Sequence, residues 1–297
     1  MGRWIAAASI AVLAGLAVVW WTVSGPEIPR AVLEKQYARP PSRFVVLADG
    51  SRIHYRDRGP REAPVVILLH GFAGSLFVWE PWSQSLSDRF RVVSLDLPGN
   101  GLTGPVPSGT YSQAAITETV RLFADRLGLK KFALAGNSMG GGVAARFAER
   151  YPDRVTALIL IDAAGAKIES GPRLRLLYYG AHIPILNRYV LRKAVDRRYR
   201  FQDMEGMSDA LLAHFRLADD FYVWDHVTAI KAPVLIQWGA KDNVIPRAAA
   251  DAWHRALKGS KLIVYPDAGH VAMADAPAAS VKDARDFLLS ALVAAQP

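Results

Sequence analysis

A single serine stands between glycines at the point where an apolar run ends. Residues 136–140 read Gly-Asn-Ser-Met-Gly and follow the apolar run 132–135. Glycine on both sides permits a tight strand-to-helix turn that lifts the Ser138 hydroxyl clear of a sheet. The following stretch, 139–150, is typical of a helix, whose N-terminal N–H groups favour a developing negative charge. Ser138 is therefore the predicted nucleophile, and the turn lacks the lysine of a phosphate-binding P-loop.

A serine hydroxyl is a weak nucleophile until a neighbouring base takes its proton. Among the seven histidines, His270 follows the apolar run 261–266 and comes last in the chain. The order serine, acid, histidine is the one expected for a scaffold that presents its serine on a strand-to-helix turn. His270 is therefore the predicted base.

The base needs a carboxylate that holds its imidazole by the Nδ1–H. Asp242 follows the apolar run 233–238, in a loop that also contains a glycine and a helix-starting proline. Asp162, Asp96 and Asp267 also follow apolar runs, and each could instead hydrogen-bond a loop. Asp242 is the predicted acid, and Asp162 remains the alternative.

Acyl chemistry at a serine also needs two N–H donors for the oxyanion. The run 65–70 ends in His70-Gly71, a turn that can supply one donor beside the nucleophile. We expect the backbone N–H groups of Phe72 and Met139 to form this oxyanion hole. We interpret His70 as a structural hydrogen-bonding residue, not as the base.

The predicted catalytic residues are far apart in the sequence, so a β-sheet must bring them together. Nearly continuous apolar runs are typical of parallel strands covered on both faces, and Asp49-Gly50 predicts a hairpin between the first two strands. The expected strands are 43–48, 52–57, 65–70, 90–96, 132–135, 157–162, 233–238 and 261–266. The expected helices are 75–86, 113–127, 139–150, 246–257 and 277–294. This alternation predicts an α/β fold with a mostly parallel sheet between helices, whose strand ends carry the functional groups.

The expected organisation has four parts. Residues 1–25 form a transmembrane anchor or a signal peptide, and 26–42 form a proline-containing linker. The core consists of 43–163 and 227–297. Between them, 164–226 holds no convincing strand but many Leu, Tyr and Arg at helical spacing, which predicts a helical cap or lid over the sheet.

The N-terminal segment is the most apolar part of the chain. Trp4–Trp21 is an 18-residue stretch without a charge, nearly long enough to cross a hydrocarbon core of about 30 Å. A cleavable signal peptide would have a shorter apolar region of about 7–15 residues. We expect an uncleaved single-pass anchor in a bacterial inner membrane, and a periplasmic or secreted protein if the segment is cleaved.

The composition limits the chemistry and the partners. The chain has no cysteine, which excludes disulfides, thiolate metal sites and a cysteine nucleophile. Its net charge is +9, and much of this charge lies between residues 171 and 203. No nucleic-acid-binding motif accompanies that run. Its expected partner is an anionic membrane surface, unless it is a solvated helix face.

In this order and at this spacing, the motifs HGFAG, DLPGNG, GNSMGG, GAKDNVIP and PDAGH resemble those of the α/β-hydrolase superfamily. The resemblance covers the chain from about residue 43. It implies catalytic roles for Ser138, Asp242 and His270 and a helical cap after the strand that ends at Asp162. Within the superfamily, the chain is most similar to membrane-anchored monoacylglycerol lipases and to bacterial esterases and lipases.

Other members of the superfamily are a poorer match. The GNSMGG elbow also resembles that of carbon–carbon hydrolases of ring-fission products, but these usually carry a tryptophan where this chain has Val271. Asn100 and Thr103 replace the common histidine and serine of the DLPGHG-S pattern. Serine at the elbow argues against epoxide hydrolase and haloalkane dehalogenase chemistry, which uses aspartate there.

The expected function is that of a serine hydrolase that cleaves lipid or medium-chain carboxylic esters through an acyl-enzyme, without a metal or organic cofactor. The apolar side chains of the cap could line an acyl pocket. The alternatives are a carbon–carbon hydrolase, a thioesterase, an amidase or a cofactor-free haloperoxidase. A binding protein on an inactive hydrolase scaffold is a further alternative, although such a protein would not need all three residues.

Overall fold

The computed structural model of the 297-residue chain describes residues 15, 27–166, 179, 199, 201–216 and 224–294. The expected anchor, 1–25, lies outside the described residues except for Gly15. The basic side chains between 171 and 203, which we expected to face an anionic membrane surface, also lie outside the described residues. Within the described part, no helix is both long enough and apolar enough to cross a membrane.

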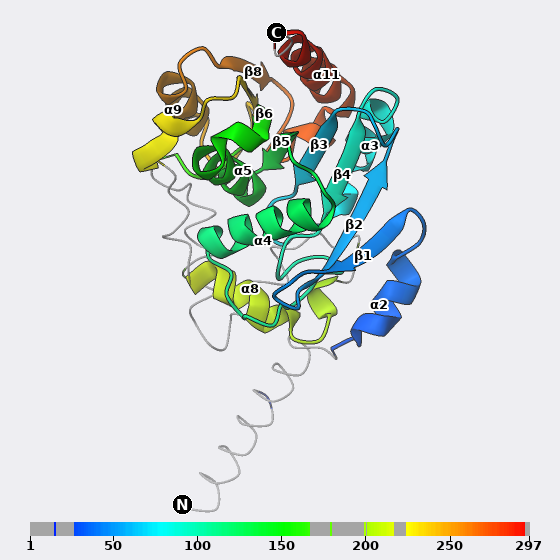
Figure 1. Ribbon diagram of the computed structural model, residues 1–297. Helices are drawn as coiled ribbons and strands as arrows, with labels where there is room; N and C mark the ends of the chain where they lie inside the picture. Colours follow the sequence, from blue (N-terminus) through cyan, green and yellow to red (C-terminus); the bar gives the residue numbers. More distant parts are fainter. Residues whose placement is uncertain are drawn as a thin grey trace, which may run out of the picture.

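Eight strands form one sheet in the order β1-β2-β4-β3-β5-β6-β7-β8 (Figure 1). Their bounds are β1 Ser42–Val46, β2 Arg52–Arg58, β3 Val65–Leu69, β4 Arg91–Leu95, β5 Phe132–Asn137, β6 Val155–Ile161, β7 Val234–Gly239 and β8 Lys261–Tyr265. The strand β2 pairs antiparallel with β1 and β4, and the remaining pairs are parallel. The prediction of a mostly parallel sheet is confirmed.

The sequence explains these pairings. Gly50 adopts a φ of 82° in the turn between β1 and β2, a conformation that glycine reaches without a steric penalty. The central strands β5 and β7 are buried at every position, because helices cover both faces of the parallel part of the sheet. Their apolar runs therefore mark the strands from which the site is built.

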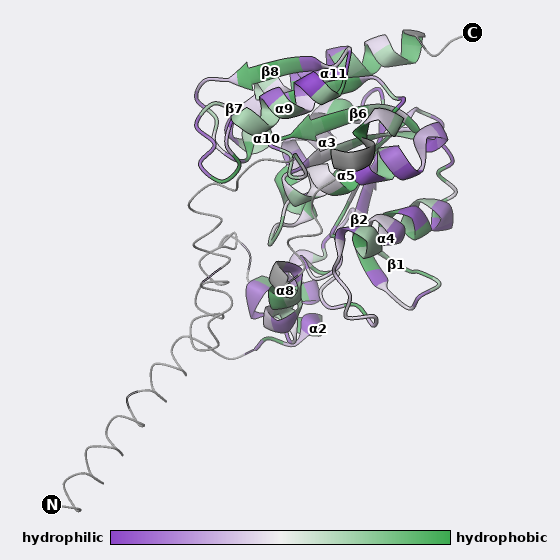
Figure 2. Cartoon of the chain, turned by 90° about the vertical axis from the view of Figure 1, so that its left-hand side faces the viewer, coloured by the Kyte–Doolittle hydropathy of each residue, from purple (hydrophilic) through white to green (hydrophobic). Residues whose placement is uncertain are grey.

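Helices cover the two faces of the sheet (Figure 1). One face packs against α4 (Gln113–Arg126), α5 (Met139–Arg150) and α9 (Ala248–Ala256). The other packs against α3 (Glu80–Leu86), the short α10 (Ala272–Asp275) and α11 (Pro277–Ala294). Alternate residues of a strand face opposite layers: Ile67 and Leu69 lie in the first cluster, whereas Val66 and Leu68 lie in the second. Figure 2 shows β6 and β8 as mostly hydrophobic strands, whereas the helices carry both hydrophobic and hydrophilic residues.

The expected linker over 26–42 needs correction, because most of it is structured. Helix α2 (Arg30–Tyr37) begins directly after Pro29, and Ile28 forms a parallel β-bridge with Met204. The Ile28 N–H donates to Asp203 O at 2.6 Å. The prolines indicated an extended linker, but burial of Leu33, which is fully inaccessible, stabilises a helix between them.

The described part of the expected cap consists of short helices. They are the 3-10 turn Phe201–Asp203, helix α8 (Met207–Arg216) and the 3-10 turn Trp224–Ala229. Apolar residues of α2 and α8 pack together with Leu102 and Ala73. The two helices lie together beyond the sheet in Figure 2, so α2 and the described part of the cap form one layer.

Candidate active site

Ser138 lies in a strained turn between β5 and α5. Its φ is 52° and its ψ is −119°, a conformation that L-residues rarely adopt and that is found at functional sites. A Cβ on Gly136 would lie 2.2 Å from Gly140 O, and one on Gly140 would lie 2.4 Å from Leu69 O. Both glycines are therefore required by close backbone approach, as the Gly-x-Ser-x-Gly pattern indicates.

Three side chains meet at this turn. The Ser138 Oγ lies 2.8 Å from His270 Nε2, and the His270 Nδ1 lies 2.8 Å from Asp242 Oδ2. The serine hydroxyl can donate to Nε2 only if the imidazole proton is on Nδ1, where it donates to the carboxylate. The structure thus brings together the three residues that the sequence indicated from three separate strand ends.

The environment fixes the roles that these groups can take. The Asp242 side chain is fully buried, whereas the His270 side chain is 19% exposed. The Asp242 Oδ1 accepts hydrogen bonds from Val244 N–H at 2.8 Å and from Ile245 N–H at 3.0 Å. The second oxygen is left to face the imidazole. Such an arrangement orients a histidine and stabilises its protonated form.

The other aspartates considered from the sequence have partners other than the imidazole. Asp162 accepts the N–H groups of Gly239 and Ala272, and no hydrogen bond joins it to His270 among the described contacts. Asp96 is fully buried and bonds His54 at 2.7 Å. Asp267 pairs with Lys241 at 2.8 Å, and its side chain is 90% exposed. Geometry thus favours Asp242 over Asp162 as the partner of the imidazole.

The end of β3 lies against the first turn of α5. The contact of Gly140 with Leu69 O brings the N-terminus of α5, where Met139 is the first residue, next to the turn that contains Phe72. His70 Nδ1 lies 2.7 Å from Gly71 O, and His70 Nε2 accepts from Leu97 N–H at 2.9 Å. Burial lowers the pKa of His70, so it is a neutral structural residue, as expected.

Asn100 has a role that the sequence did not reveal. Its Oδ1 accepts from Ala73 N–H at 2.8 Å, in the turn after β3, and Ala73 has a φ of 55°. His214 of α8 is buried beside it, with its Nε2 at 3.0 Å from Pro98 O. Burial lowers the pKa of His214 to about 4. A neutral histidine of the cap thus contacts the loop that holds the expected oxyanion turn.

Asn137, next to the nucleophile, also has contacts that the sequence did not reveal. Its Nδ2 donates to Ile161 O at 3.2 Å and to His270 O at 3.1 Å. It therefore ties the end of β5 to the backbone of the histidine loop. The residues around Asn137 in the sequence do not predict these contacts, because the partners are backbone carbonyls far along the chain.

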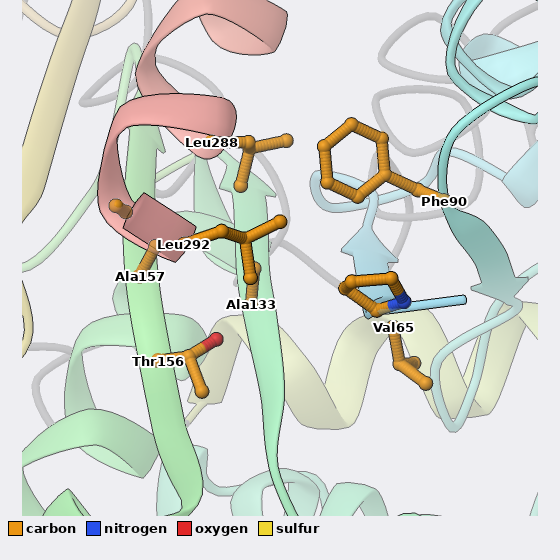
Figure 3. A pocket seen from close by; sticks show the side chains of 9 residues that line it. Val65, Phe90, Ala133, Thr156, Ala157, Leu288 and Leu292 are labelled. Carbon is orange, nitrogen blue, oxygen red and sulfur yellow. The ribbon is translucent and has the colours of Figure 1, made fainter. Parts of the chain in front are cut away.

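A small apolar pocket lies elsewhere (Figure 3). It is lined by residues such as Val65, Ala133, Ala157 and Leu288, between α11 and the amino ends of β3, β5 and β6. Ser138 lies at the opposite, carboxyl end of β5. The pocket volume of about 10 Å³ leaves room for about one water molecule, and the pocket lies apart from Ser138. Among the described residues, no group of three or more His, Asp or Glu could hold a metal ion.

Comparison with known proteins agrees with this geometry. A family model described as the alpha/beta hydrolase fold matches residues 64–180, and one described as a TAP-like protein matches 222–296. The chain belongs to the α/β-hydrolase superfamily. The α/β-hydrolase match contains Ser138, and the TAP-like match contains Asp242 and His270.

Individual relatives in the superfamily differ in activity. The chain is 31% identical to the dihydrolipoyllysine-residue acetyltransferase component of the acetoin cleaving system of Cupriavidus necator, over 75% of this chain, but it spans only 63% of that relative. It is 28% identical to monoacylglycerol lipase abhd6-B of Xenopus laevis, over 80% of this chain and 79% of the relative. The crystal structure of a membrane phospholipase A aligns with a TM-score of 0.71 and 25% identity, over 98% of this chain and 99% of that one.

Proposed function

We propose that this α/β-hydrolase is a serine hydrolase that cleaves carboxylic esters of lipids or of medium-chain acyl groups. The observation that carries the proposal is the continuous hydrogen-bonded array Ser138–His270–Asp242, with both contacts at 2.8 Å. The strained φ of 52° at Ser138 supports it, because strain of this kind is retained where a hydroxyl must be presented and not packed.

The proposed reaction uses the array in two half-reactions. His270 Nε2 takes the Ser138 proton as Oγ attacks the acyl carbon, and the carbonyl oxygen becomes an oxyanion. His270 then gives that proton to the leaving alkoxide, so that an alcohol leaves and an acyl-enzyme remains. Water repeats the sequence: His270 takes a proton from water, hydroxide adds to the acyl carbon, and Ser138 is released with its proton restored.

We assign oxyanion stabilisation to the backbone N–H groups of Phe72 and Met139. The close approach of α5 to the end of β3 supports this assignment, because it brings the two backbone segments together. Loss of one such donor typically raises the barrier by about 3–4 kcal/mol. Asn100, which accepts from Ala73 N–H, would hold this turn in place.

Two observations support a lipid substrate and a membrane location. The similar proteins include a monoacylglycerol lipase and a membrane phospholipase A. The uncharged stretch Trp4–Trp21 has the length and the flanking tryptophans of a membrane anchor. We therefore propose a single-pass N-terminal anchor, which lets lipid substrate enter the active site from the bilayer.

A panel of p-nitrophenyl esters of increasing acyl length tests the proposal. We expect turnover with a preference for medium or long chains, and its loss in Ser138→Ala. Turnover that survives Ser138→Ala would contradict the proposed nucleophile. Absence of turnover on every ester, with Ser138 still labelled by a fluorophosphonate, would contradict the ester assignment and favour carbon–carbon hydrolysis.

A further inference from the structure

Asp162 occupies a central position among the loops of the site. It directly follows β6, next to β5, whose end carries Ser138. Residues before and after Asp162 hold the serine: Ile161 O accepts from Ser138 N–H at 3.0 Å, and Ala164 N–H, two residues after Asp162, donates to Ser138 O at 3.0 Å. The end of β6 is thus part of the nucleophile turn.

The Asp162 carboxylate binds the segment before Asp242 and the segment after His270, at Gly239 of β7 and Ala272 of α10. Its Oδ1 accepts from Gly239 N–H at 2.8 Å, three residues before Asp242. Its Oδ2 accepts from Ala272 N–H at 2.9 Å, two residues after His270. Ala272 is the first residue of α10, and such an N–H has no acceptor within its own helix.

We propose that Asp162 is a positioning residue that uses one oxygen for the acid loop and the other for the histidine loop, and so sets the distance between Asp242, His270 and Ser138. This inference rests on the proposed function. Only a carboxylate can accept with both oxygens, because an amide places an NH₂ group against one of the two N–H donors.

Burial and backbone conformation support this role. Asp162 is fully inaccessible and has a φ of 45°, a conformation that is uncommon in residues other than glycine. Desolvation by burial raises the pKa of Asp162 to about 7, against the effect of the two N–H donors. A buried carboxyl in a strained backbone is retained at a cost, and its two contacts to the catalytic loops supply the reason.

Asp162→Asn is the direct test, because asparagine also tolerates a positive φ. The first readout is the rate at which a fluorophosphonate labels Ser138, which needs no ester turnover. The second is the low-field proton NMR resonance of the His270 Nδ1–H that faces Asp242. We expect labelling to slow about 100-fold, as for a displacement of about 1 Å. We also expect a shifted or broadened resonance and a lower kcat at unchanged KM on the best ester.

Asp57→Asn is the matched control. Asp57 lies on β2, its side chain is 2% exposed, and it bonds Arg91 through both oxygens, at 3.1 Å and 2.9 Å. We expect this variant to lower the Tm but to keep the wild-type labelling rate and NMR resonance. A folded Asp162→Asn that also keeps both would overturn the inference.

Ala272→Pro provides a second variant if Asp162→Asn does not fold. Proline is accepted at the first position of a helix, where it removes only an N–H group, here the donor to Asp162 Oδ2. We expect slower labelling and a changed NMR resonance; wild-type values in the folded variant would overturn the inference. Wild-type protein that is labelled at Ser138 but hydrolyses no ester would instead contradict the proposed function alone.

Discussion

At the scale of single residues, replacement of the Asp242 carboxylate can keep the shape of the site and change only its hydrogen bonding to the histidine. Its Oδ2 faces His270 while its Oδ1 is held by two backbone N–H groups. Asp242→Asn keeps the shape but offers an NH₂ group to the imidazole and so favours the wrong tautomer. We expect kcat to fall about 10⁴-fold, as in other serine triads, in stopped-flow or continuous ester assays.

Asp267→Asn is the control for this change, because Asp267 also follows a strand but pairs with Lys241 at the surface. Its activity should equal that of the wild type. A comparable loss in both variants would mean that Asp242 acts through loop stability and not through the histidine.

Asp162 gives the stability of the protein a characteristic pH dependence. Its pKa is raised by burial to about 7 in the folded protein, against about 3.9 in an unfolded chain. Below about pH 4 both states hold the proton. As the pH rises towards 7, the unfolded chain releases it first, so the folded state loses up to about 4 kcal/mol of relative stability.

Asp162→Asn lacks this titration. We therefore expect the free energy of unfolding of the variant, minus that of the wild type, to rise between pH 4 and pH 8. Urea unfolding at several pH values measures this difference. Parallel stability curves for the two proteins would contradict the raised pKa.

At the scale of elements, α2 packs on the described part of the cap. Leu33 of α2 is fully buried in a cluster with Ala73, Met204, Met207 and others, whereas the adjacent Val32 is 52% exposed. We expect Leu33→Ala to cost about 2–5 kcal/mol in the free energy of unfolding, and Val32→Ala to change it by no more than about 0.5 kcal/mol. Equal effects of the two substitutions in urea unfolding would show that α2 is not packed on the cap.

Strands and long helices were predictable because their residues repeat a simple pattern. The buried strands β5 and β7 are mostly apolar, and the helix expected over 139–150 coincides with α5. Helix α2 was not predictable, since its stability depends on tertiary burial of Leu33 between flanking prolines. The short helix α10 was not predicted either, because four residues are too few to show a helical period.

The site was predictable in part. Glycines around Ser138 leave a sequence signature because close backbone approach excludes side chains. Asp242 and Asp162 could not be distinguished with certainty, since both follow strands and only the distance to His270 separates them. The contacts of Asn137, Asn100 and His214 could not be predicted, because their partners are distant backbone atoms.

At the scale of the whole molecule, we expect the N-terminal segment to be separable from the catalytic core. The stretch Trp4–Trp21 precedes Ile28, where the chain pairs with Met204. Deletion of residues 1–26 would remove the proposed anchor but keep the contacts of Ile28 and α2. We expect the truncated protein to leave the membrane pellet after carbonate extraction and to hydrolyse soluble esters at the rate of the full chain.

The same truncation should reduce hydrolysis of lipid in vesicles, because substrate would no longer be supplied at the membrane. A truncated protein that still sediments with membranes would contradict the anchor. A further deletion through residue 38 provides a comparison, since it also removes α2 and should lower the stability of the cap.

In the proposed mechanism, Ser138 forms an acyl-enzyme. Rapid-quench mass spectrometry of the full chain mixed with a p-nitrophenyl ester tests it most directly. We predict that the peptide containing Ser138 gains the mass of the acyl group within the first turnover, and that Ser138→Ala shows no such gain. Ester turnover without any acylated Ser138 peptide, or acylation at another residue, would contradict the proposed mechanism.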